Sequence, residues 1–356
     1  MSNALAAEVL RFMREPEGKN FDELAIAIYQ YQRRENTAFA KYCEALGVPH
    51  KVDSWKEIPA LPQIAFKRAM ICSFPPERIR AEFRTSGTTG EGHGKHFFPS
   101  LHLYETAVQK GWDYFRLPRR GFALLMQHPD DAPFSSLSHM GGILASFERN
   151  RFLIGQIGEI EIDRLSALLG ADRETPVVFG TALAFIQLME RFPELRIDLP
   201  PGAIAMETGG FKGSGRETGK SELYSQISVR LGIGINSIWN EYGMTELSSQ
   251  FYSRGIGHSH HGPPWTRFQI IDPETNKEAA PNTIGLLRIF DLGNLWSVIG
   301  IQTQDLAIGR PDGGFLLLGR NPAALPRGCS RAADELLKSA GGGTMHGSPT
   351  SNRSGY

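Results

Sequence analysis

Short apolar segments that alternate with helical patterns constrain the fold of this chain more than any other feature. Gly121–Gln127 (G-F-A-L-L-M-Q) is a continuous apolar run, as expected of a strand buried on both faces. Pro176–Phe179 and Gly202–Met206 are further short apolar strands, and Gly180 leads into a helical pattern that ends near Phe192. Strands that alternate with helices predict a largely parallel sheet with helices on both faces. Ligand-binding loops are then expected at the carboxyl ends of the strands.

The rest of the chain fits this architecture. Apolar residues at helical spacing predict helices near the N-terminus, and Trp55–Phe66, interrupted by two prolines, predicts an irregular connector. Turn residues separate short strands in the last third, which we expect to be β-rich. The predicted helices are Leu5–Arg14, Phe21–Leu46, Leu101–Phe115 and Glu222–Leu231, and the predicted strands are Ile233–Trp239, Phe268–Ile271, Gly285–Phe290 and Phe315–Leu318.

The balance of charge and the scarcity of cysteine exclude several classes of protein. The chain has 356 residues, with 38 Lys and Arg against 38 Asp and Glu, so no global field attracts nucleic acid. No apolar run approaches the length of about 18 residues that a membrane-spanning helix needs. The three cysteines are too few and too scattered for a disulfide framework or a zinc knuckle, which suggests a reducing compartment. We therefore expect a cytoplasmic protein without a nucleic-acid partner or a membrane span.

A loop rich in glycine and hydroxyl groups follows an extended, basic stretch. Arg84–Gly90 reads R-T-S-G-T-T-G, so backbone N–H groups and three hydroxyls can converge on a triphosphate. A Walker-type loop fails on spacing, because Thr89 stands where a glycine is needed and His96 replaces the Ser or Thr after Lys95. A plain polar turn is the other alternative. The candidate phosphate-binding residues are Ser86, Gly87, Thr88, Thr89 and Gly90.

A second polar segment, Asn240–Glu246 (N-E-Y-G-M-T-E), follows a predicted strand. Gly243 permits a tight turn, which leaves Thr245 and Glu246 side by side on a loop. A threonine hydroxyl suits an α-phosphate, and Mg²⁺ prefers one or two carboxylates together with phosphate oxygens. The alternative is that Glu246 begins a surface helix. Asn240 could hydrogen-bond the edge of adenine, and Tyr242 could stack on it. Glu246 is the candidate metal ligand and a catalytic candidate. The candidate nucleotide-binding residues of this segment are Asn240, Glu241, Tyr242, Gly243 and Thr245.

Two further segments complete the set of candidate nucleotide-binding residues. T-G-G at Thr208–Gly210 closes a predicted strand, which makes Gly209 and Gly210 candidates. T-Q-D-L-A and G-G-F-L-L-L-G-R, within 303–320, contribute Asp305 and Arg320. A carboxylate has lone pairs for two donors, so Asp305 can accept both ribose hydroxyls. The alternative is that Asp305 is an ordinary residue of a strand-to-loop turn.

In this order, the three main segments resemble the phosphate loop, nucleotide loop and ribose-binding segment of the adenylate-forming superfamily. Within it, T-S-G-T-T-G, E-T-G-G-F-K-G, N-E-Y-G-M-T-E-L and L-G-R-N-P-A-A-L-P-R-G-C-S resemble the acyl-protein synthetase (LuxE) family. The resemblance implies ATP and Mg²⁺ as cofactors and a long-chain fatty acid as substrate. It also implies transfer of the acyl group to a cysteine near the C-terminus and then to a partner acyl reductase.

The resemblance also implies an architecture. We expect an α/β adenylate-forming N-terminal domain over residues 1–319, with parallel-rich sheets flanked by helices and a β-rich last third. A truncated C-terminal segment, 320–356, would replace the mobile domain of ordinary acyl-CoA ligases, and its tail has too few apolar residues to fold. The lysine of that mobile domain has no counterpart here, so Lys95 or Lys212 is expected to supply its positive charge.

Cys329 is the candidate acyl carrier. It lies in R-G-C-S-R between Arg327 and Arg331, ahead of a short predicted helix. Neighbouring guanidinium groups and a helix N-terminus both favour the thiolate, which is the form that attacks an acyl adenylate. The alternative is a small buried hydrophobic residue, as most free cysteines are.

Two segments contain histidines that are candidates for substrate or metal binding. His139 and Gly141, in S-H-M-G-G, occupy the stretch where the superfamily places a substrate-side loop, so both are candidates to border the acyl pocket; the alternative is an ordinary loop histidine. His258–His261 (H-S-H-H) suggests zinc, but the spacing lacks the i, i+4 pairing of helical ligands, which favours a structural or substrate-lining role.

Two other functions stay open from the sequence. An acyl-CoA or aryl-CoA ligase of the phenylacetate-activating kind would hand its acyl group to free CoA, with Cys329 dispensable. A catalytically inactive nucleotide-binding or scaffold subunit would bind ATP without releasing pyrophosphate.

Overall fold

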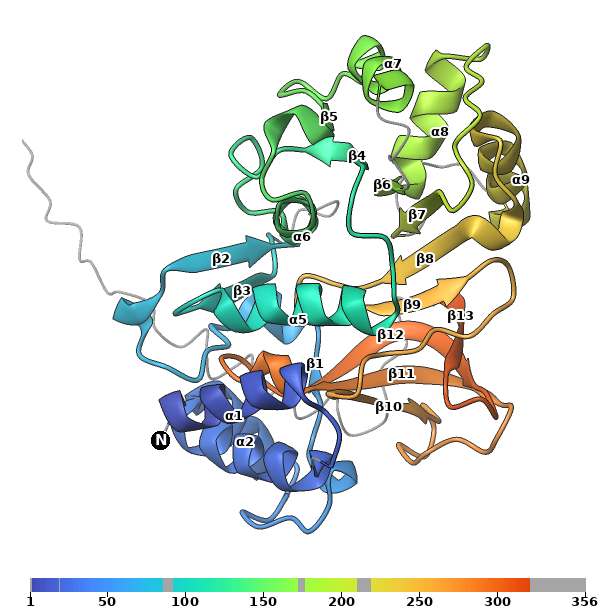
Figure 1. Cartoon of the computed structure of the whole chain (residues 1–356). Coiled ribbons are helices and arrows are strands. Elements are labelled where there is room, and N and C mark those ends of the chain that lie inside the picture. The colour runs from blue at the N-terminus through green and yellow to red at the C-terminus, as the bar shows by residue number, and fades with distance from the viewer. Residues whose placement is uncertain (1, 19, 86–91, 172–176, 210–218, 321–356) are drawn as a thin grey trace, which may run out of the picture.

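The computed structural model describes residues 2–18, 20–85, 92–171, 177–209 and 219–320 (Figure 1). Three helices open the chain: α1 (Ser2–Arg14), α2 (Phe21–Glu35) and α3 (Thr37–Ala45). The expected helix over Phe21–Leu46 is therefore two helices. Asn36 divides them, because its side chain accepts a hydrogen bond from Phe39 N and caps α3.

A six-stranded sheet follows in the order β5-β4-β6-β7-β8-β9, parallel except for the pair β8–β9. Both of its faces are buried. Phe122 and Leu124 face one apolar cluster, while Ala123 and Leu125, which alternate with them, face a second cluster packed with α8 and α9. This confirms the continuous apolar run as a fully buried strand. The strands are β4 (Phe122–Gln127), β5 (Phe152–Ile154), β6 (Val177–Thr181), β7 (Ile204–Thr208), β8 (Ile238–Tyr242) and β9 (Phe251–Arg254).

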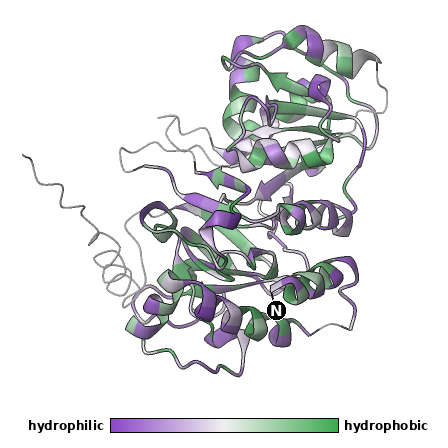
Figure 2. Ribbon diagram, turned by 90° about the vertical axis from the view of Figure 1, so that its left-hand side faces the viewer, coloured by the Kyte–Doolittle hydropathy of each residue, from purple (hydrophilic) through white to green (hydrophobic). Residues whose placement is uncertain are grey.

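Helices cover this sheet, and Figure 2 shows them banded in hydrophilic and hydrophobic residues, as expected of amphipathic surface helices. They are α5 (His102–Tyr114), α6 (Ser136–Leu144), α7 (Ile162–Ala171), α8 (Ala182–Arg191) and α9 (Lys220–Leu231). No helix in the described part of the chain is both long and apolar enough to cross a bilayer.

The last third supplies four strands of a second, five-stranded sheet, and the short β1 supplies the fifth. This sheet is mostly antiparallel, in the order β1-β12-β11-β10 with β13 paired to β12. This confirms the β-rich character of the last third. The strands of this sheet are β1 (Leu61–Pro62), β10 (Thr266–Ile271), β11 (Ile284–Asp291), β12 (Gly300–Gly309) and β13 (Phe315–Arg320). The short helical turns are η1 (Trp55–Glu57), α4 (Ala65–Arg68), η2 (Pro76–Arg78), η3 (Arg149–Arg151), η4 (Ile235–Ser237) and η5 (Leu292–Asn294).

Two sequence-based expectations need correction in this region. Asp305 lies inside the ten-residue strand β12, not in a strand-to-loop turn. Buried polar residues such as Gln302 and Thr303 conceal this strand from a search for apolar periodicity. The strand predicted over Ile233–Trp239 begins only at Ile238, because the preceding residues form the turn η4.

Candidate active site

A cavity of about 160 Å³ lies at the carboxyl ends of the parallel strands. Thr181 on β6, Thr208 on β7 and Glu241 on β8 stand in register across this edge of the sheet, so three polar side chains form a row. The location is the one that the alternation of strands and helices predicted. The lining residues are Tyr104, Ser136, Leu137, Met140, Thr181, Thr208, Gly209, Glu241, Gly243, Met244, Thr245, Leu247 and Gln250.

Glu241 is the buried carboxyl group of this row, with 4% of its surface exposed. Burial raises its pKa to about 7, the negative charge of Glu207 adds to the rise, and a hydrogen bond from the Thr208 hydroxyl opposes it. A substantial fraction of Glu241 therefore carries a proton at neutral pH.

Tyr242, Asp305 and Arg320 meet between the two sheets. The Tyr242 hydroxyl donates to Asp305 Oδ2 at 2.7 Å, and Arg320 Nε lies 3.4 Å from Asp305 Oδ1. Asp305 and Arg320 are directly paired residues of β12 and β13. Burial and the neighbouring carboxylate both raise the pKa of Tyr242 well above its usual value, so its hydroxyl stays protonated as a donor. The structure thus brings together three residues that the sequence selected from separate segments.

Asn240 belongs to a buried hydrogen-bond network. Its Nδ2 donates to Glu207 Oε2 at 2.5 Å, and its Oδ1 accepts from His260 Nε2 at 2.6 Å. Burial lowers the pKa of His260 to about 3, so this imidazole is neutral. The Asn240 amide is therefore engaged with protein groups at both ends, and its contact with the edge of adenine stays a prediction.

The histidine-rich segment does not converge on one point. His260 is buried beside Asn240, whereas His261 Nε2 lies 3.6 Å from Asp312 Oδ2 and His258 is exposed. Within the described ranges, no group of three or more His, Cys, Asp or Glu side chains is arranged to hold a metal ion. The structure thus favours the structural interpretation of this segment over zinc binding.

The loop after β8 carries Thr245 and Glu246 without forming a helix, so the surface-helix alternative is wrong. Glu246 is only 6% exposed. Asp291, at the end of β11, fixes the loop by accepting hydrogen bonds from the backbone N–H groups of Ser248 and Ser249 at 3.0 and 2.8 Å. Burial raises the pKa of Asp291 to about 6 against the effect of these donors.

The strands β2 (Ala81–Arg84) and β3 (Lys95–Phe98) form the hairpin around the phosphate-loop candidate. Thr85 N donates to Gly94 O at 2.9 Å, and Gly94 N donates to Thr85 Oγ1 at 2.8 Å, which closes its base. Lys95 is exposed at the start of β3. Ser86, Gly87, Thr88, Thr89 and Gly90 lie outside the described residues, as do Gly210, Lys212 and Cys329, so their roles stay predictions.

His96 joins this hairpin to the loop that carries Thr245 and Glu246. Its Nδ1 donates to the Thr245 carbonyl oxygen at 2.9 Å, and burial lowers its pKa to about 4. In the sequence, His96 was noted only because it occurs where a Walker-type loop would have Ser or Thr. Thr181, Thr208 and Asp291 were missed as well. Thr181 and Thr208 each lie two residues after the end of a predicted strand, so a search for polar residues just beyond those strands could have found them.

His139 and Gly141 lie on the helix α6, not on a loop as expected. His139 Nε2 is 3.4 Å from Glu105 Oε1, and its ring packs against Phe83, so the cavity wall is formed instead by neighbouring apolar residues of α6. A Cβ on Gly141 would stand 2.7 Å from Met126 Sδ, so this glycine allows α6 to lie close to β4.

This architecture is the fold of adenylate-forming enzymes. A structure of 2-hydroxyisobutyryl-CoA ligase in complex with 2-HIB-AMP matches with a TM-score of 0.62 at 15% identity, covering 84% of this chain and 67% of that one. ATP-bound MatB from Rhodopseudomonas palustris matches with a TM-score of 0.50 at 18% identity, covering 70% and 49%. The chain thus spans about half the length of MatB, and at these identities the likeness establishes the fold alone.

Comparison of sequences is more specific. No family model matches the chain. The protein named Long-chain-fatty-acid--luciferin-component ligase from Aliivibrio fischeri is 22% identical over 321 residues, which covers 84% of this chain and 83% of that protein. The resemblance to acyl-protein synthetases within the adenylate-forming superfamily is thereby confirmed.

Proposed function

We propose that this protein activates a long-chain fatty acid with ATP and Mg²⁺, carries the acyl group on Cys329, and passes it to a partner acyl reductase. The observation that carries the proposal is the cavity at the strand ends. It combines a polar row with an apolar wall. Tyr242, which bonds to Asp305, stands in the chain between Glu241 and Gly243, two residues that line the cavity. The name of the Aliivibrio fischeri relative and the nucleotides bound in the similar solved structures agree with this chemistry.

The first step joins two anions. A carboxylate oxygen of the acid attacks the α-phosphorus of ATP, and pyrophosphate leaves with the electrons of the broken P–O bond. The Thr245 hydroxyl suits the α-phosphate, while Asp305 retains lone pairs for ribose hydroxyls beside its bond to Tyr242. The buried carboxylate of Glu246, next in sequence to the cavity-lining Thr245, matches the oxygen ligands that Mg²⁺ prefers. When bound, Mg²⁺ neutralises charge on the phosphates.

The second step needs a nucleophile. A thiolate attacks the acyl carbon of the adenylate, a thioester forms, and AMP leaves. The two cysteines in the described part of the chain are poor candidates, because Cys43 and Cys72 are buried and burial raises the pKa of both thiols, that of Cys43 to about 12. This supports Cys329, with its flanking arginines, as the carrier. Lys95 or Lys212 would supply the positive charge for the adenylation step.

The test uses labelled tetradecanoic acid, ATP and Mg²⁺ with wild type, Cys329→Ser and the matched control Cys43→Ser. Label that survives denaturation and is released by hydroxylamine is expected on wild type and Cys43→Ser alone. If no protein keeps label while pyrophosphate is released, a ligase that uses free CoA replaces the proposal. If ATP binds without pyrophosphate release, the protein is a nucleotide-binding subunit.

A further inference from the structure

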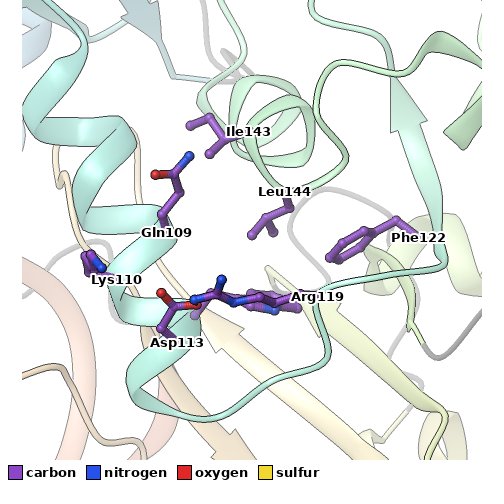
Figure 3. Close-up of a pocket in the computed structure, with 8 residues that line it drawn as sticks. Gln109, Lys110, Asp113, Arg119, Phe122, Ile143 and Leu144 are labelled. Atoms are coloured by element: carbon purple, nitrogen blue, oxygen red, sulfur yellow. The ribbon is translucent and has the colours of Figure 1, made fainter.

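A second cavity, of about 320 Å³, opens between α5, α6 and the start of β4 (Figure 3). Its inner wall is apolar, with Trp112 from α5, Phe122 from β4, and Ile143 and Leu144 from α6. Its rim is polar and charged, formed by Gln109, Lys110, Asp113 and Arg119. Asp113 and Arg119 form an ion pair across part of this rim.

The same two helices line both cavities. On α6, Leu137 and Met140 line the candidate active site, and Leu144, one turn after Met140, lines the second cavity. Residues four apart share a helix face, so a single face of α6 runs from one cavity to the other. On α5, Tyr104 lines the first cavity and Trp112, two turns later, lines the second.

The distance between the cavities suits a long acyl chain. From Leu137 to Leu144 the axis of α6 advances by about 10 Å, at roughly 1.5 Å per residue. The separating side chains are apolar: Val108 lies midway between Tyr104 and Trp112 on α5, and Met140 is 3% exposed. Methionine has an unbranched, flexible side chain that repacks readily, so Met140 can turn aside for an inserted chain.

We propose that the second cavity receives the distal methylene groups of the acyl chain whose carboxylate lies beside Glu241. This inference rests on the proposed function and adds the element that selects chain length. A short acid would fill the first cavity alone, whereas a long acid would pass Met140 and bury its end against Trp112, Phe122 and Leu144. Each methylene group buried there raises kcat/KM by about fourfold.

The test compares octanoate with tetradecanoate by pyrophosphate release. Leu144→Trp fills the second cavity, and Leu183→Trp, at a leucine 39% exposed on α8, is the matched control. Leu144→Trp is expected to lower kcat/KM for tetradecanoate about tenfold or more, the effect of expelling two or more methylene groups, and to leave that for octanoate unchanged. An equal effect on both acids, or none, overturns the inference. If wild type releases pyrophosphate with neither acid, it is the proposed function that fails.

A second measurement uses the unaltered protein, so it stands even if Leu144→Trp does not fold. Tetradecanoate with a diazirine at its terminal carbon is irradiated with wild type and ATP, and the labelled residues are identified by mass spectrometry. Insertion at Trp112, Ile143 or Leu144 is expected. Insertion confined to other residues overturns the inference. Octanoate with the same group is the control and should not label Trp112, Ile143 or Leu144.

Discussion

The two sheets contribute to the candidate site in different ways. The parallel sheet supplies residues from the ends of its strands, such as Thr208 and Glu241, because all carboxyl ends of parallel strands meet at one edge. The antiparallel sheet has no such edge, and it supplies Asp305 from the middle of β12. A site residue at a strand end can be located from the local pattern. The position of a site residue in the middle of a strand depends on the register between strands, which no local pattern reveals.

The two regions also differ in their interiors. The strands β4 and β6 bury apolar residues on both faces, whereas the antiparallel region buries polar groups such as Asp291, Asn294 and Gln302. Buried polar groups are costly when a partner is removed. Substitutions in the antiparallel region should therefore disturb stability and function together.

The largest effect is expected at Asp291, where the antiparallel sheet holds a loop of the parallel one. Asp291→Ala should lower the free energy of unfolding by about 4 kcal/mol, because it leaves several buried N–H and O–H donors without an acceptor. Urea unfolding measures this. Asp272→Ala is the control and should cost much less, because Asp272 is only partly buried and its carboxylate accepts from the backbone N–H of Glu274 at a surface turn. Equal stability of the two variants would refute the role of Asp291.

The next largest effect is expected at Glu241, at the edge of the parallel sheet, where stability should depend on pH. The pKa of Glu241 rises from 4.5 to about 7 on folding, so between these values the unfolded state loses the proton that the native state keeps. Stability therefore falls as pH rises through this window. Glu241→Gln, neutral throughout, should gain up to about 3 kcal/mol over wild type between about pH 5 and about pH 8.

Unfolding curves across this pH range, with the exposed Glu222→Gln as control, provide the measurement. A constant difference between Glu241→Gln and wild type would show that Glu241 ionises alike in both states.

A substitution at Asp305 tests whether the middle of β12 contributes to nucleotide binding. Asp305→Ala should weaken binding of a non-hydrolysable ATP analogue about 30-fold, since hydrogen bonds to a charged group contribute about 2 kcal/mol. Calorimetric titration measures the affinity. Asp312→Ala, at the turn between β12 and β13, changes the same hairpin outside the site and should bind normally. Similar affinities of the two variants would remove Asp305 from the nucleotide site.

The smallest effect is expected at His96, which connects the β2–β3 hairpin to the loop that carries Thr245. Asparagine places an amide N–H near the position of Nδ1, so His96→Asn should retain the bond to Thr245 O, whereas His96→Leu loses it. His96→Leu should therefore raise KM for ATP more than His96→Asn, by about fivefold, the equivalent of about 1 kcal/mol. Equal KM values would show that the bond does not position Thr245.

Much of the fold could be predicted from the sequence, because many helices and strands are determined by residues that are close together in the chain. The buried strand β4 is set by a few neighbouring residues, and so is the start of α2, where the Asn20 side chain caps the helix by accepting from Asp22 N. β12 could not be predicted in this way, since its buried polar residues find partners only across the sheet, as Gln302 does with Leu287 O at 3.2 Å.

By itself, the sequence determined the alternation of strands and helices, the polar loops at the strand ends, and the resemblance to adenylate-forming enzymes. Only the tertiary structure decided that Tyr242, Asp305 and Arg320 meet, that His96 supports Thr245, and that one face of α6 lines two cavities. The physical reason is the separation, along the chain, of the residues that interact. Periodicity and caps act between neighbours in the chain, whereas register and burial are set when distant segments pack.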